Sequence, residues 1–175
     1  MAEPAPLILT LSLDPASFAR LDALRREHFP PERNQLDAHL TLFHALPGET
    51  LEEIRANLAV LAGGTPPMPL RFTGLRSLGR GTAVVVESPP LLALRAMLVS
   101  AWHSRLTPQD RQGFRPHVTI QNFVAPDAAR ALVAQGLDSF EGTGTGMALW
   151  HYRGGPWEAV EEFAFKREGR GRPGE

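Results

Sequence analysis

Apolar and polar positions along the chain predict a succession of short strands and amphipathic helices. The run 7–13 is short and mostly apolar, which indicates a buried strand. Asp14 followed by Pro15 is typical of a helix start, because aspartate caps free backbone N–H groups and proline suits the first turn. Apolar residues then recur at near-helical spacing until Pro30 and Pro31, which end the helix.

The same signals continue along the rest of the chain. Thr50 with Glu53 predicts a capping box at the start of a second helix, the glycine-rich turn 79–81 predicts a hairpin, and 108–113 is expected to be a polar loop. We expect strands over 36–46, 70–78, 82–87, 115–124, 147–152 and 159–165, and helices over 50–61, 88–106 and 126–136. The order β-α-β-α-β-β-α-β-α-β-β indicates an α+β (mixed α/β) fold with recurring strand-helix-strand units.

The predicted strand around residue 117 carries reactive polar residues on one of its faces. Side chains alternate along a strand, so Arg115, His117 and Thr119 share one face. Val118 and Ile120 point to the other face, where a core would take them. An apolar strand with a basic group, a titratable base and a hydroxyl on one face indicates a functional site.

An earlier predicted strand repeats this pattern with His39 and Thr41 on one face and leucines on the other. Phe43 shares the His39 face by strict alternation, whereas His44 falls on the opposite face and is left out of the predicted site. Each of the two strands has a predicted helix before and after it. Two halves related by a pseudo-two-fold axis would therefore bring both histidines to a common cleft.

Two histidines that face one cleft form a natural acid-base couple. Imidazole titrates near neutral pH, so one ring can accept a proton while the other donates one. Hydrolysis of a phosphodiester needs this pairing. The hydroxyls of Thr41 and Thr119 could donate hydrogen bonds to the non-bridging phosphate oxygens. Arg115 could add a charge-assisted contact.

Composition limits the class of protein and of partner. The chain has 175 residues, 43% of them hydrophobic, which fits one domain or two small lobes that share a core. A net charge of −1 argues against a long electrostatic nucleic-acid footprint. There is no cysteine, so disulfides and thiolate metal sites are excluded, and we expect a cytoplasmic protein. The apolar run 7–13 is too short to span a bilayer, so no membrane association is expected.

Other residues have weaker functional signals. Phe43 could stack on a base, with a core position as the alternative, and Arg80 and Tyr152 could reach substrate from a turn and a late strand. Zinc held by His39, His117 and His151 would need ligand spacing that the chain lacks, so no metal is expected. The glycine-rich segment 142–146 lacks the ending of a phosphate-binding loop and is followed by a strand.

The paired segments His39-Leu40-Thr41-Leu42 and His117-Val118-Thr119-Ile120 resemble the His-x-Thr/Ser-x motifs of the 2H phosphoesterase superfamily. The group they resemble most is that of the 2′-5′ RNA ligase / RNA 2′,3′-cyclic phosphodiesterase proteins. The resemblance implies a bilobal fold, two pseudo-two-fold related lobes of antiparallel or mixed sheet with helices outside and a central cleft. We expect one such domain over 1–167 and a flexible tail over 168–175.

The resemblance also implies an activity, the cleavage of 2′,3′-cyclic phosphates to 2′-phosphomonoesters without cofactor or metal. Carried over by motif, His39 and His117 are the acid-base pair, with His117 favoured as the base, and Thr41 and Thr119 contact phosphate. The substrates implied are RNA 2′,3′-cyclic phosphate ends or small cyclic nucleotides, acted on by a monomer, with possible 2′-5′ RNA ligase activity. The alternative is a binding module of the same fold that holds nucleotides or RNA ends without turnover.

Overall fold

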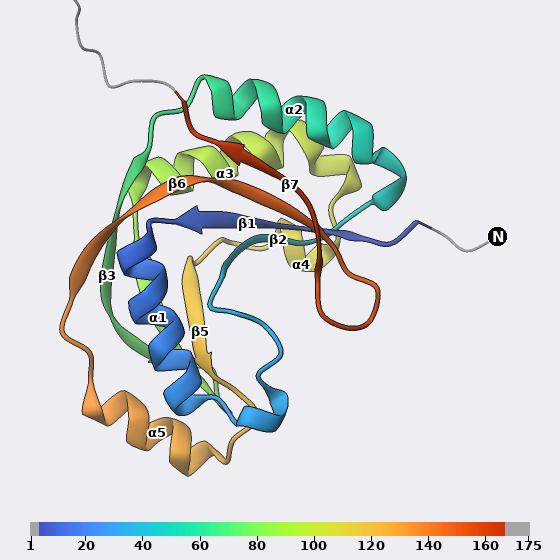
Figure 1. The fold of residues 1–175 in the computed structure, drawn as a ribbon. Coiled ribbons are helices and arrows are strands. Elements are labelled where there is room, and N and C mark those ends of the chain that lie inside the picture. The colour runs from blue at the N-terminus through green and yellow to red at the C-terminus, as the bar shows by residue number, and fades with distance from the viewer. Residues whose placement is uncertain (1–3, 167–175) are drawn as a thin grey trace, which may run out of the picture.

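The computed structural model describes residues 4–166, so the expected tail over 168–175 lies outside the described residues. Figure 1 shows a curled sheet with helices around it. The elements follow the predicted order, with one added short helix: β1 Leu7–Leu13, α1 Pro15–His28, β2 Leu40–Leu46, α2 Leu51–Gly63, β3 Met68–Ser77, β4 Thr82–Glu87, α3 Pro89–Trp102, α4 Pro108–Arg111, β5 His117–Gln121, α5 Pro126–Gln135, β6 Phe140–His151 and β7 Glu158–Ala164.

All described strand pairs are antiparallel, and β6 joins them into one sheet. The strand order is β2-β1-β6-β3-β4-β5, and β7 pairs with β6 off this path. The first part of β6 pairs with β3, from Phe72↔Phe140 to Met68↔Gly144. Its second part pairs with β1 on one side and with β7 on the other. One lobe is therefore β2-β1-β6-β7 and the other is β5-β4-β3-β6, which confirms the two-lobed α+β fold.

The local signals in the sequence explain where most helices begin. The Asp14 carboxylate accepts a hydrogen bond from the Ser17 N–H, and Pro15 occupies the first turn of α1. Ser88 caps α3 in the same way, through the Leu91 N–H. The predicted capping box at Thr50 is wrong, because its hydroxyl instead donates to the Pro47 carbonyl within a short 3₁₀ turn.

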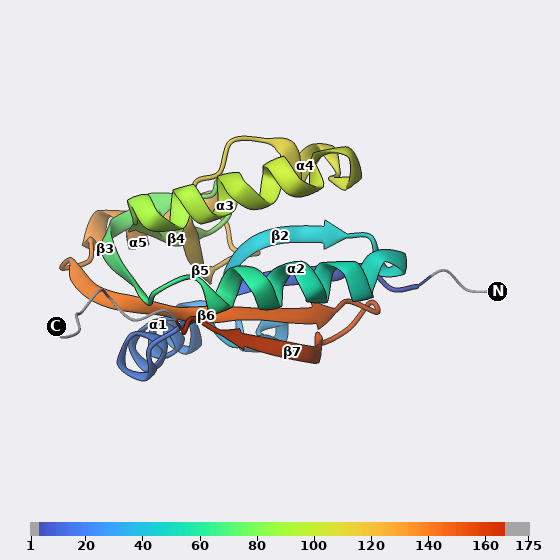
Figure 2. The same ribbon diagram turned by 90° about the horizontal axis from the view of Figure 1, so that it is seen from above.

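Helices cover the outside of both lobes (Figures 1 and 2). α2 and α3 are joined by a hydrogen bond from the Trp102 indole to Asn57, whereas α5 lies at the opposite end of the molecule, and α1 contacts β5 of the other lobe. The buried apolar residues form one core, in which the largest side chains are Trp102, Phe43 and Phe72. Within residues 4–166 no helix is long and apolar enough to cross a membrane.

Several predicted boundaries are wrong. β2 begins at Leu40 and β5 at His117, so His39 lies immediately before its strand and His117 is the first residue of its strand. The expected loop at 108–113 contains α4 instead, and its cap is the Thr107 side chain. β6 begins at Phe140, which places the glycine-rich segment 142–146 within the strand. Strand pairing with β3 and β1 overrides the low intrinsic strand preference of glycine there.

Candidate active site

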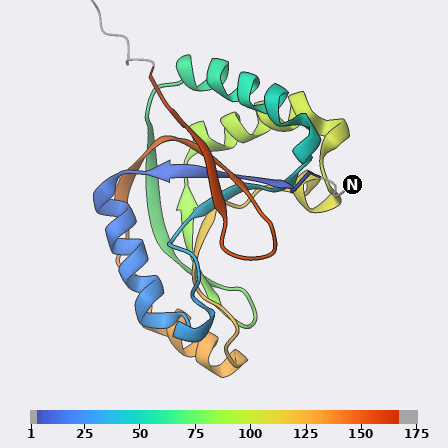
Figure 3. The ribbon, with the colours of Figure 1, turned by 45° about the vertical axis from the view of Figure 1, so that its right-hand side comes forward.

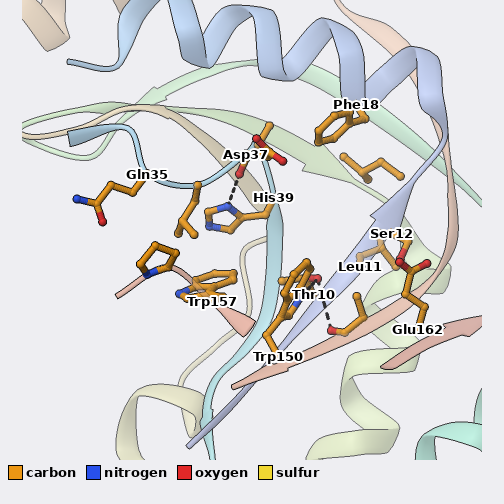
Figure 4. Close-up of a pocket in the computed structure, with 15 residues that line it drawn as sticks. Thr10, Leu11, Ser12, Phe18, Gln35, Asp37, His39, Trp150, Trp157 and Glu162 are labelled. Atoms are coloured by element: carbon orange, nitrogen blue, oxygen red, sulfur yellow. Dashed lines mark hydrogen bonds between the residues drawn. The ribbon is translucent and has the colours of Figure 1, made fainter. Parts of the chain in front are cut away.

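His39 lies immediately before β2, and its ring is oriented by the preceding backbone. The Nδ1 atom is 2.8 Å from the carbonyl oxygen of Asp37. Because a carbonyl oxygen can only accept a hydrogen bond, Nδ1 carries the proton and Nε2 is left to exchange a proton with a ligand. The loop between β6 and β7 can be followed in Figure 3. Its residue Trp157 packs against the His39 ring at a centroid distance of 4.7 Å (Figure 4).

His117 repeats this arrangement in the other lobe. Its Nδ1 atom is 2.9 Å from the carbonyl oxygen of Arg115, again two residues before the histidine. The same tautomer follows, with Nε2 free to act on a ligand. The two histidines are thus equivalent in position and in hydrogen bonding, as the internal repeat in the sequence predicts.

The environment of His39 favours its neutral form. Burial lowers the pKa of His39 to about 4, and the positive charges of Arg25, His117 and His44 act in the same direction. The Asp37 carbonyl opposes them by stabilising the charged ring. β2 and β5, the strands that follow the two candidate histidines or begin with one, contact each other.

The environment of His117 also lowers the pKa of the ring, but through different neighbouring residues. Burial lowers its pKa, and the charges of Arg76, His44 and Arg115 add to the effect. Arg76, from β3, places Nη2 at 3.5 Å from the His117 Nδ1 atom. Both imidazoles therefore favour their neutral form, with the proton on Nδ1, when no anion is bound.

A pocket of about 400 Å³ lies beside His39, and we call it the His39 pocket (Figure 4). Its wall includes Trp150 and Trp157, and the Trp150 indole N–H donates to the Thr10 hydroxyl at 3.0 Å. Gln35 and Glu162 add polar groups around it. This combination of flat apolar surface and a few fixed polar groups is typical of a small-molecule site.

The register between β1 and β2 contains a bulge that changes which side chains reach the cleft. Thr10 faces Thr41 and Leu9 faces Phe43, so β2 advances two residues where β1 advances one. Such an extra residue shifts the alternation of side chains beyond it. As a result Phe43 turns into the core and His44 turns out, opposite to the prediction from strict alternation.

The proposed stacking role of Phe43 is therefore wrong. Its side chain is 0% exposed and packs edge-on against Trp102, with the guanidinium of Arg95 4.2 Å from its ring centre. A base could not reach it without the core being opened.

His44, which the sequence-based prediction omitted, is held at the cleft by a buried carboxylate. Asp110 in α4 is fully buried, and its Oδ1 atom lies 3.1 Å from the His44 Nδ1 atom. The same carboxylate accepts the backbone N–H groups of His44 and Ala45. Despite the cost of burial, these hydrogen bonds keep the pKa of Asp110 below its usual value, so it stays ionised. No spacing signal in the sequence links residue 44 to residue 110.

The other predicted substrate contacts do not all lie near the histidines. Arg115 is exposed next to His117. The Arg80 guanidinium instead donates a hydrogen bond to the Val124 carbonyl, beyond the far end of β5, and does not join the histidines. The basic neighbour on the β3 side is Arg76. Tyr152 is 44% exposed and lines a second pocket, the one that contains His44.

Thr41 and Thr119 are half-buried, two residues after their histidines. The Thr119 carbonyl accepts a hydrogen bond of 3.0 Å from Arg25, and this bond links α1 to β5. In the part of the chain that the structure describes, no group of three His, Asp or Glu side chains is arranged to hold a metal ion.

Comparison with known proteins gives one family match. A profile of the 2′-5′ RNA ligase superfamily matches residues 13–156. No curated protein matches the chain at a comparable level.

Solved structures show the same fold. TT0787 of Thermus thermophilus superposes with a TM-score of 0.68 at 20% identity, covering 93% of this chain and 99% of that one. E. coli LigT complexed with 3′-AMP gives a TM-score of 0.63 at 24% identity, covering 94% and 100%. LigT complexed with NADP⁺ gives 0.62 at 22% identity, also covering 94% and 100%.

Proposed function

The chain belongs to the 2′-5′ RNA ligase superfamily of 2H phosphoesterases, and on that basis we propose that it hydrolyses 2′,3′-cyclic phosphates to 2′-phosphomonoesters. The observation that supports this proposal is the equivalence of His39 and His117. Each presents an unprotonated Nε2 atom, because each Nδ1 proton is directed to the backbone carbonyl two residues earlier.

In the proposed reaction, one imidazole accepts a proton from water as the water oxygen attacks phosphorus. The bond from phosphorus to O3′ breaks, and the second imidazole protonates O3′, which leaves the phosphate on O2′. Thr41 and Thr119 donate to the non-bridging oxygens, and Arg115 and Arg76 balance their charge. An RNA 5′-hydroxyl in place of water would give a 2′-5′ linkage by the same attack.

We propose His117 as the base and His39 as the acid. Burial is the largest cause of the lowered pKa at both rings. At His117 the charges of two arginines, Arg76 and Arg115, add to it and favour the neutral form that a base needs. At His39 the ring is buried, and in a buried setting an incoming phosphate anion acts most strongly on a nearby imidazole. Substrate binding would therefore raise the pKa of His39 and supply the proton for O3′.

The test is hydrolysis of the four nucleoside 2′,3′-cyclic phosphates in EDTA by the wild type, His39→Ala and His117→Ala. We expect a 2′-phosphate product and a loss of at least about a hundredfold in kcat for each variant, in line with general acid-base catalysis. His103→Ala is the matched control, because His103 is an exposed histidine just beyond α3.

An RNA oligonucleotide with a cyclic phosphate end is tested in parallel. If the wild type turns over none of these substrates, the proposal is wrong. Binding of the same nucleotides without turnover would instead support the alternative, a nucleotide-binding module. The relatives' structures with 3′-AMP and NADP⁺ make nucleotides the natural ligands to try.

A further inference from the structure

A second pocket, of about 530 Å³, lies next to the His39 pocket and shares Gln35, Leu36, Pro156 and Trp157 with it. We call it the His44 pocket. A ligand bound at His39 could therefore extend into it without leaving the cleft.

The basic residues of the His44 pocket come from separate elements. Arg25 of α1, Arg33 of the 3₁₀ turn after α1 and His44 of β2 all line it. None of its lining residues is Asp or Glu as far as residues 4–166 are concerned. In a chain with a net charge of −1, this local excess of basic groups indicates a site for an anionic ligand.

His44 is fixed in a form suited to an anion. Asp110 holds the Nδ1 side of the ring, which leaves Nε2 as the nitrogen available to a ligand. A phosphate at Nε2 would accept a charge-assisted hydrogen bond from the imidazolium form of the ring. Asp110 is in turn held by two backbone N–H groups, so the ring has little freedom to turn away.

The lining of the pocket also includes an exposed aromatic side chain, Phe123. Phe123 is 50% exposed, with Arg33 4.4 Å from its ring centre and Phe29 packed edge-on at 6.0 Å. Phe123 also has a positive φ of 63°, an uncommon conformation for a bulky residue. Strained residues of this kind persist where the surrounding structure fixes them, and they cluster at ligand sites.

We propose that the His44 pocket binds a second phosphate group of the substrate, with His44 and Arg33 as its ligands. This inference rests on the proposed function for its location, and it narrows the substrate class. The preferred substrate carries a phosphate beyond the cyclic one. That phosphate is either the diester that joins the terminal nucleotide to the preceding one or a 5′-phosphate on a mononucleotide.

The test compares three substrates: adenosine 2′,3′-cyclic phosphate, its 5′-phosphorylated form, and a dinucleotide that ends in the cyclic phosphate. We expect the second phosphate to raise kcat/KM about tenfold, the size of one charge-assisted hydrogen bond. A gain with both larger substrates identifies any second phosphate as the ligand, and a gain with the dinucleotide alone identifies the diester. Equal kcat/KM values for all three overturn the proposal.

Variants locate the effect. The measured quantity is the kcat/KM of a substrate with the second phosphate divided by the kcat/KM of the substrate without it. His44→Gln should bring this ratio close to one. If His44→Gln does not fold, Arg33→Gln should have the same effect. His103→Gln should leave the ratio as in the wild type. A ratio that survives in both pocket variants overturns the assignment of these residues.

A binding experiment separates this proposal from the proposed function. Titration calorimetry with adenosine 2′-phosphate and adenosine 2′,5′-bisphosphate requires no turnover. Tighter binding of the bisphosphate, lost in His44→Gln, supports the pocket even if no cyclic phosphate is hydrolysed. Equal binding of the two nucleotides overturns the pocket even if hydrolysis is observed.

Discussion

The indole of Trp157 lies edge-on against the imidazole of His39, with the ring centres 4.7 Å apart. The residue comes from the loop between β6 and β7, far along the chain from the strand that His39 precedes. Its contact helps to exclude water from the ring, and burial is the largest cause of the lowered His39 pKa. The loop therefore influences the protonation of a residue on another element.

Replacement of Trp157 should change the titration of His39. We expect Trp157→Ala to raise the pKa of His39 from about 4 toward the ordinary value of 6.5, because water regains access to the ring. NMR titration of the imidazole in the ligand-free protein measures this directly. Trp157→Phe keeps an aromatic ring in place and should shift the pKa less. An unchanged pKa in Trp157→Ala would show that other groups exclude the water.

Stability should decrease as the pH falls because of the same histidine. The folded-state pKa of His39 is lowered, so below pH 6.5 the unfolded chain binds a proton that the folded protein resists. The loss begins near pH 6.5, grows as the pH falls, and is complete below about pH 4. The cost at pH 5 should be about 1–2 kcal/mol.

Urea unfolding at pH 7.5 and pH 5 measures that cost. His39→Gln should reduce the difference between the two pH values, whereas His103→Gln should leave it as in the wild type. If the stability of His39→Gln depends on pH as that of the wild type does, the lowered pKa of His39 is not the cause of the loss.

Arg76 should contribute to activity although the sequence did not indicate it. Its Nη2 atom is 3.5 Å from the His117 ring, and its charge lowers the pKa of His117. We expect Arg76→Gln to lower kcat/KM roughly tenfold through the lost phosphate contact, and to move the acidic limb of the pH-rate profile to higher pH. Arg80→Gln removes a positive charge at the far end of β5 and should have little effect on kcat/KM. If the two variants lose the same amount of kcat/KM, the effect of Arg76 comes from the overall charge and not from its contact with the site.

Phe43 should contribute to stability and not to substrate binding. Phe43→Ala should cost about 3–5 kcal/mol in the free energy of unfolding, as expected for a large buried side chain. Phe72→Ala is a matched core control, since Phe72 is also 0% exposed. Tyr152→Ala should instead leave stability nearly unchanged and raise KM. A stable Phe43→Ala protein with a raised KM would reverse our conclusion for residue 43.

The roles of the two histidines can be separated by the leaving group. A cyclic phosphate with sulfur in place of O3′ releases a thiolate, which needs no proton from a general acid. We expect this substrate to restore turnover in His39→Ala and not in His117→Ala. Rescue of His117→Ala alone would mean that the two roles are exchanged.

Most of the fold could be predicted from local signals, and part of the site could not. Alternating apolar residues, prolines and caps such as Asp14 suffice for the order of elements, because they act over a few neighbouring residues. The register of β2 against β1 is set by long-range pairing, and its bulge reverses the faces of Phe43 and His44. Arg76 and Asp110 reach the histidines from distant segments, which no periodicity within one strand can show.

β6 passes through both lobes as a single unbroken strand, paired with β3 over its first part and with β1 over its second. It connects the two histidine-bearing halves directly: β3 pairs with 140–144, and 146–151 lie between β1 and β7. A one-residue insertion near Gly144, where the partner changes, would rotate one half relative to the other and reverse the facing of its side chains. The orientation of one half relative to the other therefore depends on the number of residues in β6, and a change in that number would alter any site that both halves form.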